Sequence, residues 1–269
     1  GNAPVSTPKR GGGRRPGEAL GNHNFNGPVT TKEVVKEPTI IKVETEAVLK
    51  KENKEEQTDE SRFFMLTQID EKYKDYKAPN YVNRIGSEEL CNQFRNFMSY
   101  KLKLYYNISD IRRFIASLSV SKTMILQGMS GTGKTSLAYA FGEFLQNPTT
   151  VVPIQPMWKE RTDLIGYYNE FTKKFNETTL LYKMYEANCN KQIYITVLDE
   201  MNIARVEYYF AEFLSLLEIP NPDGRNLDVV ADKWDNDPKL LNKGKLRLPT
   251  NMWFIGTANN DDSTFSISD

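Results

Sequence analysis

The sequence predicts an α/β fold in which helices cover both faces of a parallel central sheet. From residue 123 onward, short apolar strand patterns alternate with helical ones. A glycine-rich stretch, GMSGTGKTS, lies between the first of these strands and the first helix, and two carboxylates end the apolar stretch QIYITVLDE. Regular alternation of strand and helix is typical of a parallel sheet covered on both faces. Because ligands of such sheets bind at the carboxyl ends of the strands, the glycine-rich stretch and the carboxylates predict one shared site.

The hydrophobic period predicts the individual elements. Strands are expected at 123–128, 150–155, 192–200 and 251–259, and helices at 134–147, 178–188 and 206–218. Three upstream stretches with apolar residues at helical spacing predict further helices, at 62–76, 87–106 and 109–118. Ser109 or Asp110 is the expected N-cap of the last of these.

Composition divides the chain into three parts. Residues 1–60 are rich in Gly, Pro, Asn, Lys and Glu, and are expected to form a disordered linker or tail. Residues 61–104 are expected to form a helical N-terminal segment, and residues 105–269 the α/β core. The chain does not begin with Met and stops soon after an apolar strand. Both ends are therefore expected to be cuts in a longer protein.

The overall composition excludes several classes of protein. The chain has 269 residues, with 35 basic and 35 acidic side chains, and zero net charge argues against a protein that coats nucleic acid with its whole surface. No apolar run approaches the length of a membrane span, so we expect no membrane partner and a cytoplasmic location. The single histidine, His23, cannot build a histidine-based metal site, which argues against a zinc enzyme. Cys91 and Cys189 are expected to be reduced, buried thiols.

The glycine-rich stretch has the spacing of a phosphate-binding loop. Its glycines let backbone N–H groups surround phosphate oxygens, and the following helix contributes the positive end of its dipole. Lys134 is expected to reach the β- and γ-phosphates, and the Thr135 hydroxyl to bind Mg²⁺. The expected nucleotide contacts are Gly128, Met129, Ser130, Gly131, Thr132, Gly133, Lys134, Thr135 and Ser136.

Three polar residues at strand ends predict hydrolysis. Asp199 ends a buried strand, where it is placed to hold Mg²⁺. Glu200 follows it and is placed to polarise a water molecule for attack on the γ-phosphate, which favours hydrolysis over transfer to another acceptor. Asn259, at the end of the last strand, is a candidate hydrogen-bond partner of that water or of the γ-phosphate. An ordinary turn asparagine explains Asn259 equally well.

Together these residues resemble the AAA+ ATPases, and most closely the McrB/MoxR-like, dynein-related branch. GMSGTGKTS resembles the Walker A motif, YITVLDE resembles Walker B, and WFIGTANND resembles sensor 1. The insertion between Glu218 and Asn251 looks like the hairpin that precedes sensor 1 in this branch. The resemblance covers about residues 105 to 269. It implies the P-loop NTPase fold, an αβα sandwich with a parallel central sheet.

The resemblance also implies roles and partners. It makes Lys134, Glu200 and Asn259 catalytic, makes Thr135 and Asp199 the magnesium ligands, and makes ATP or GTP with Mg²⁺ the cofactor. Proteins of this family form rings, usually hexamers, in which a neighbour supplies an arginine to the γ-phosphate. We expect such self-assembly to need an arginine finger, sensor 2 and lid that would follow the end of this chain. Arg205 is a candidate contact between subunits or at the pore, with a surface ion pair as the alternative.

The expected function is that of a motor subunit that hydrolyses ATP or GTP to remodel or translocate a macromolecule, either DNA or protein. A McrB-like role would be in DNA restriction, and a MoxR-like role would be that of a protein-remodelling chaperone. A monomeric P-loop phosphotransferase and a non-hydrolysing scaffold are the alternatives. Trp158, Tyr167 and Tyr168 are expected to form an aromatic cluster in a polar segment, where they either face a central channel and grip substrate or pack locally.

Overall fold

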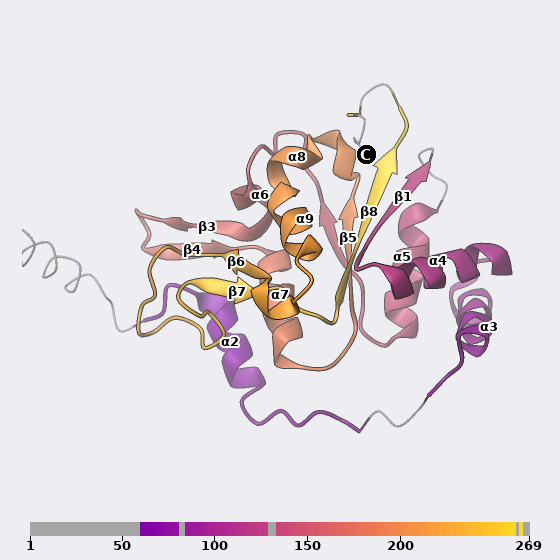
Figure 1. Cartoon of the computed structure of the whole chain (residues 1–269), viewed down its shortest axis with the longest axis horizontal. Coiled ribbons are helices and arrows are strands. Elements are labelled where there is room, and N and C mark those ends of the chain that lie inside the picture. Colours follow the sequence, from indigo (N-terminus) through magenta and orange to yellow (C-terminus); the bar gives the residue numbers. More distant parts are fainter. Residues whose placement is uncertain (1–59, 81–83, 129–132, 262–263, 266–269) are drawn as a thin grey trace, which may run out of the picture. The chain divides into compact units, whose positions relative to one another are not determined.

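The computed structural model describes residues 60–80, 84–128, 133–261 and 264–265. Its centre is a four-stranded sheet with the order β1-β8-β5-β2, and every neighbouring pair in it is parallel (Figure 1). This confirms the predicted fold class. The four strands are β1 (Thr123–Gly128), β2 (Thr150–Pro153), β5 (Tyr194–Asp199) and β8 (Met252–Asn259).

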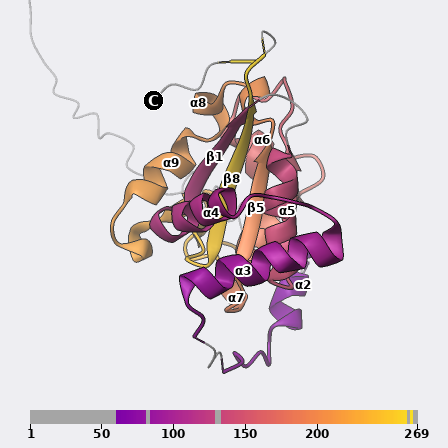
Figure 2. The ribbon, with the colours of Figure 1, turned by 90° about the vertical axis from the view of Figure 1, so that its right-hand side faces the viewer.

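Helices cover both faces of the sheet. Strand β5 is buried on both sides: Tyr194 and Leu198 belong to one apolar core, and Ile195 and Val197 belong to the other. This double burial explains the continuous apolar run in the sequence. Figure 2 shows α9 and α5 on opposite sides of the strands. The first core includes residues of α7 (Thr179–Cys189), α8 (Val206–Tyr209) and α9 (Ala211–Glu218), and the second includes residues of α3 (Ser87–Phe97), α4 (Ile108–Val120) and α5 (Lys134–Phe144).

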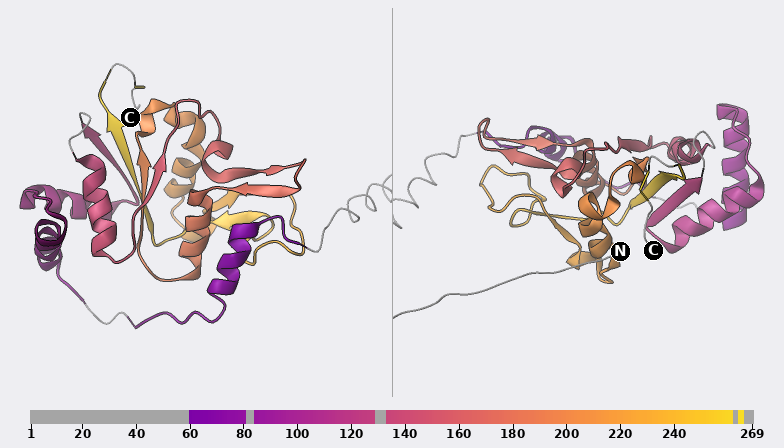
Figure 3. Two further views of the ribbon diagram at one scale, coloured as in Figure 1. Left: turned by 180° about the vertical axis from the view of Figure 1, so that it is seen from behind. Right: turned by 90° about the horizontal axis from the view of Figure 1, so that it is seen from above.

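Two antiparallel hairpins are inserted into this frame. One pairs β3 (Gly166–Asn169) with β4 (Lys174–Glu177), and the other pairs β6 (Asn226–Asp228) with β7 (Lys245–Arg247). Figure 3 shows both hairpins beside α2 (Phe64–Lys72), at the end of the molecule away from α3. The second hairpin lies in the insertion predicted between Glu218 and Asn251. The remaining short elements are η1 (Met98–Leu102), α6 (Arg161–Ile165), η2 (Met201–Ile203) and η3 (Pro222–Gly224).

Several helix predictions are wrong in detail. The helix expected at 87–106 is α-helical only to Phe97 and ends at Leu102, before Lys103 with its left-handed backbone. Helix α4 begins at Ile108 with Asn107 as its N-cap, so Ser109 and Asp110 lie inside the first turn. The Asn107 carbonyl already accepts hydrogen bonds from the backbone N–H groups of Asp110 and Ile111, which places the start earlier. The helix expected at 206–218 is divided at Phe210, whose φ of −118° and ψ of −8° interrupt the helical backbone. Its fully buried ring stacks on Phe213 at 5.3 Å between ring centroids.

Other sequence predictions have mixed outcomes. Cys91 is buried as predicted, whereas Cys189 is only half-buried; both are free thiols, and burial raises the pKa of Cys189 to about 11. His23 and almost all of the predicted tail lie outside the described residues. Within the described part of the chain, no helix is long and apolar enough to cross a membrane.

Candidate functional site

The carboxyl ends of β1, β8 and β5 form one edge of the sheet, and the predicted site residues gather there. Gly128, the last residue of β1, pairs in register with Asn259, the last residue of β8. Helix α5 begins at Lys134 after Gly133, which adopts a left-handed backbone with φ +80°. The Lys134 ammonium group donates to the Gly128 carbonyl at 3.1 Å, and Ser136 lies in the same first helical turn. The predicted contacts Met129, Ser130, Gly131 and Thr132 lie outside the described residues.

The two predicted magnesium ligands lie in contact. The Thr135 hydroxyl donates a hydrogen bond to Asp199 Oδ1 at 2.9 Å, although the residues are 64 positions apart. Both side chains are half-buried. A hydroxyl and a carboxylate are the hard oxygen ligands that Mg²⁺ prefers, and Mg²⁺ commonly takes its remaining ligands from water and substrate phosphates. Among the described residues no group of three or more His, Cys, Asp and Glu side chains is arranged to hold a metal. The donor set therefore fits a magnesium ion that arrives with a nucleotide.

Glu200 is more exposed than the Thr135–Asp199 pair. It has a left-handed backbone, with φ 53° and ψ 45°, where the chain turns from β5 into η2. Its side chain is exposed, and Oε1 accepts a hydrogen bond from the Asn259 amide at 3.3 Å. The predicted catalytic carboxylate and the predicted sensor thus lie side by side. A positive φ in a residue other than glycine is uncommon and often marks a functional position.

Two further residues hold this arrangement, and the sequence analysis missed both. The Thr257 hydroxyl donates to Asp199 Oδ1 at 2.8 Å and accepts from the Glu200 backbone N–H at 2.8 Å. The buried Asn202 side chain donates to the Asn259 carbonyl at 2.8 Å and accepts from the Asn259 N–H at 3.1 Å. Thr257 lies within the WFIGTANND motif and Asn202 lies two residues after YITVLDE, which was the one available signal. The contacts themselves join positions that are far apart in the sequence.

A hollow of about 510 Å³ lies next to the start of α5, between α4 and β1. Tyr106 lines it and donates from its hydroxyl to the Gly133 carbonyl at 3.1 Å. Burial raises the pKa of Tyr106, so this phenol remains a neutral donor. Asp110 and Arg113 of α4 also line the hollow, and Arg113 Nη1 lies 3.4 Å from Asp110 Oδ1. The space therefore offers polar and aromatic groups directly beside the phosphate-loop helix.

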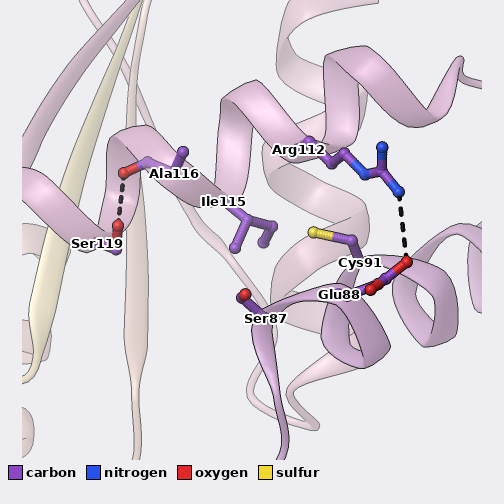
Figure 4. A pocket seen from close by; sticks show the side chains of 7 residues that line it. All are labelled: Ser87, Glu88, Cys91, Arg112, Ile115, Ala116 and Ser119. Carbon is purple, nitrogen blue, oxygen red and sulfur yellow. Dashed lines mark hydrogen bonds and ion pairs between the residues drawn. The ribbon is translucent and has the colours of Figure 1, made fainter.

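A second hollow, of about 610 Å³, lies between α3 and α4. Glu88 and Arg112 line it and form the ion pair drawn in Figure 4, with a distance of 3.7 Å between Glu88 Oε1 and Arg112 Nη2. Cys91 and Ile115 also line this hollow. It contains none of the predicted site residues and is separate from the candidate site.

The three aromatic residues of the polar segment do not form one cluster. Trp158 packs edge-on against Tyr209 at 5.6 Å, and Tyr168 packs against Trp234 at 5.7 Å, both between ring centroids. Local packing therefore accounts for these two. Tyr167 is 50% exposed.

Two further surface residues bear on the sequence predictions. Phe171 lies between β3 and β4 and is 99% exposed, a residue that the sequence analysis did not single out. The Arg205 guanidinium lies over the Phe265 ring at 5.0 Å. Within the described ranges Arg205 has no ion pair, so the surface ion pair considered for it is not found.

Comparisons with known proteins agree with the motifs. The family model of the AAA domain (dynein-related subfamily) matches residues 123–269, which is more than half of the chain. The chain is also similar to the Type IV methyl-directed restriction enzyme EcoKMcrB subunit of Escherichia coli (strain K12), with 25% identity over 173 residues. That alignment covers 62% of this chain and 36% of the relative, so the chain spans about a third of the relative's length. Among solved structures it is similar to a chain of the S. cerevisiae Hsp104:casein complex in its extended conformation, with 14% identity, a TM-score of 0.44, and coverage of 71% of this chain and 31% of that chain.

The matched region includes both strand ends that carry the carboxylates and the amide, together with the start of α5. The chain belongs to the dynein-related subfamily of AAA domains, a family of nucleotide hydrolases.

Proposed function

We propose that this chain is the nucleotide-hydrolysing part of a ring-forming motor that remodels or translocates a macromolecule. The observation that carries the proposal is the pairing at the sheet edge. Thr135 contacts Asp199, and Asn259 contacts Glu200. A site that only bound nucleotide would have no need for a carboxylate exposed beside an amide, and a phosphotransferase would need an acceptor site in place of a residue that activates water.

Each side chain has a defined task in this proposal. Lys134 binds the β- and γ-phosphates, and Thr135 with Asp199 holds Mg²⁺, which neutralises charge on the phosphates when it is bound. Glu200 accepts a hydrogen bond from the attacking water and so polarises it, and the Asn259 amide keeps the Glu200 carboxylate oriented. The products are the nucleoside diphosphate and inorganic phosphate. The hollow lined by Tyr106 and Asp110 is the proposed place for the base, which is that of ATP or of GTP.

The proposed substrate is a macromolecule. The relative from Escherichia coli is a subunit of a methyl-directed restriction enzyme, which favours DNA, as in a McrB-like restriction system. Tyr167 and Phe171 present aromatic rings to solvent on one hairpin, and exposed aromatic rings stack on bases or press against a polypeptide. A MoxR-like role on a protein substrate is the second candidate, and these rings serve it equally well.

The experiment that tests the proposal uses Glu200→Gln in the full-length protein, with Mg-ATP and separately with Mg-GTP. Nucleotide binding should be retained and phosphate release should fall by about 100-fold or more, because the group that polarises water is lost. Glu207→Gln, at an exposed position on α8, is the matched control and should hydrolyse normally. Sedimentation of Glu200→Gln should show a ring with one of the two nucleotides. Normal turnover would remove Glu200 from the mechanism, and a monomer with both nucleotides would favour the phosphotransferase.

A further inference from the structure

Among the described residues before the family domain, the guanidinium of Arg62 is the most deeply buried positive charge. Arg62 is 5% exposed and forms a two-pronged ion pair with Asp237, with Nε–Oδ1 at 2.9 Å and Nη2–Oδ2 at 2.8 Å. The same guanidinium lies 4.1 Å from the centroid of the Trp234 ring and 5.5 Å from that of the Tyr168 ring. Nη2 also donates to the Asp232 carbonyl. One side chain thus contacts strand β3 and also the segment that joins β6 to β7, called the 228–245 insertion below.

The start of α2 is fixed to the other strand of the same hairpin. The Phe175 N–H donates to the Arg62 carbonyl at 2.8 Å. The Glu177 carboxylate accepts from the first backbone N–H groups of α2, at 2.8 to 2.9 Å. A carboxylate at this place satisfies N–H groups that have no partner within the helix and complements the helix dipole. Phe63 stacks on Phe175 at 4.7 Å between ring centroids.

The second half of α2 also contacts the 228–245 insertion. Asp70 Oδ2 accepts from the Lys239 N–H at 2.9 Å, and Asp70 Oδ1 accepts from the Tyr185 hydroxyl at 2.6 Å. The Tyr185 hydroxyl in turn accepts from the Leu240 N–H at 3.0 Å. Figure 3 shows how α2 lies against both hairpins. The 166–177 hairpin and the 228–245 insertion, together called the two insertions below, are far apart in the sequence and both contact this one helix.

We propose that Arg62 is a positioning residue that makes the 166–177 hairpin, the 228–245 insertion and α2 one cooperative unit. Each hairpin alone has two short strands, and an isolated two-stranded hairpin is marginally stable in water. Shared contacts with α2 therefore decide whether the insertions open separately or together. A role of this unit in contacting a macromolecule, through the exposed rings of the hairpin, rests on the proposed function. The cooperativity itself does not depend on it.

Hydrogen exchange of backbone amides in the full-length protein, measured by mass spectrometry without nucleotide, tests this directly. Arg62→Lys keeps the charge but loses the planar fork that pairs with Asp237 and stacks on the rings. It should speed exchange at least about tenfold in both 166–177 and 228–245. Lys74→Ala is the matched control, because Lys74 follows α2 and its side chain forms an exposed ion pair with Glu71 at 3.9 Å. It should leave both insertions unchanged, and β5 and β8 should stay protected in every variant.

Glu177→Gln separates cooperativity from local contact. Glu177 caps α2 from the first hairpin, and its substitution should also speed exchange in the 228–245 insertion through α2. Faster exchange confined to 166–177 would show that the insertions open independently and would overturn the proposal. An Arg62→Lys variant in which neither insertion changes would do the same. Nucleotide hydrolysis is measured in parallel, so that a failure of the proposed enzyme activity is distinguished from a failure of this inference.

Discussion

The Thr257 hydroxyl contacts the Asp199 carboxylate and the Glu200 backbone, and its removal gives a sharp test of the geometry. Thr257 is 2% exposed. Its hydroxyl donates to Asp199 Oδ1 and accepts from the Glu200 N–H, both at 2.8 Å. Valine has nearly the same shape and lacks the hydroxyl, so Thr257→Val removes the two hydrogen bonds with little change in packing. We expect it to lower the rate of nucleotide hydrolysis.

The magnitude follows from the hydrogen bonds. A hydrogen bond to a charged acceptor contributes about 1.5–3 kcal/mol. If that much stabilisation of the transition state is lost, kcat falls by about 10- to 100-fold. The free energy of unfolding should fall by about 1–3 kcal/mol as well, because the Glu200 N–H loses its acceptor.

Thr257→Ser is the matched control. It keeps the hydroxyl and loses one methyl group, which costs about 1 kcal/mol of stability in a packed interior. Its kcat should stay within about threefold of the original, a barrier change under 1 kcal/mol. Steady-state phosphate release with Mg-ATP and Mg-GTP gives kcat and KM, and urea unfolding gives the stability of each variant. If valine keeps full kcat, or if serine loses as much kcat as valine does, the hydroxyl does not position Asp199 and the Glu200 turn for hydrolysis.

Two further predictions concern binding and pH. Lys134→Ala should weaken nucleotide binding by about 10- to 100-fold, because a charged contact to the phosphates is lost; unchanged affinity in a titration would place the phosphates elsewhere. Burial acts to raise the pKa of Glu186, but hydrogen bonds from Lys72 and Lys183 bring that pKa below 4.5 overall. The ionised Glu186 therefore stabilises the fold above pH 4.5, and this stabilisation is lost as the pH falls through the lower pKa of the folded state. Glu186→Gln should therefore cost about 1–2 kcal/mol in urea unfolding at pH 7, and the cost should shrink as the pH is lowered below 4.5; a cost independent of pH would contradict this.

The sequence predicts the central sheet well because each strand carries its own signal. Strand β1 spans the predicted range, and β5 and β8 lie within theirs. The apolar runs of β5 and β8 reflect burial on both faces, which is a local property of the chain. The predicted site residues also meet, because parallel strands bring their carboxyl ends to one edge.

The β3–β4 hairpin escaped prediction for a physical reason. Its strands are four residues each and mostly polar, so the hydrophobic alternation is weak. Gly166 is the informative position. Its φ is +95°, and a Cβ there would meet the Asn176 carbonyl oxygen at 1.9 Å, so only glycine fits this approach of the strands. A glycine in a polar segment does not disclose such a contact until its partner is known.

The residues that hold the site and the hairpins were missed because their partners are distant. Asn202 and Asn259 are 57 positions apart, and Arg62 and Asp237 are 175 apart. Arg62 follows a highly charged stretch, where a solvated arginine is the natural expectation. Its burial is explained by a carboxylate and aromatic rings that the fold alone brings together.

The left-handed backbone of Glu200 explains how two adjacent carboxylates serve different tasks. Asp199 ends the strand and points to the hydroxyls of Thr135 and Thr257, whereas the turn at Glu200 sends the next carboxylate to the surface beside Asn259. A left-handed residue other than glycine costs about 1–3 kcal/mol and persists only when its surroundings hold it. Here the Glu200 N–H is held by Thr257 at 2.8 Å, and the Glu200 carbonyl accepts from the Ile203 N–H at 2.9 Å. The same threonine therefore orients the proposed magnesium ligand and maintains the backbone turn that exposes the proposed catalytic carboxylate, so the two tasks are lost together when its hydroxyl is removed.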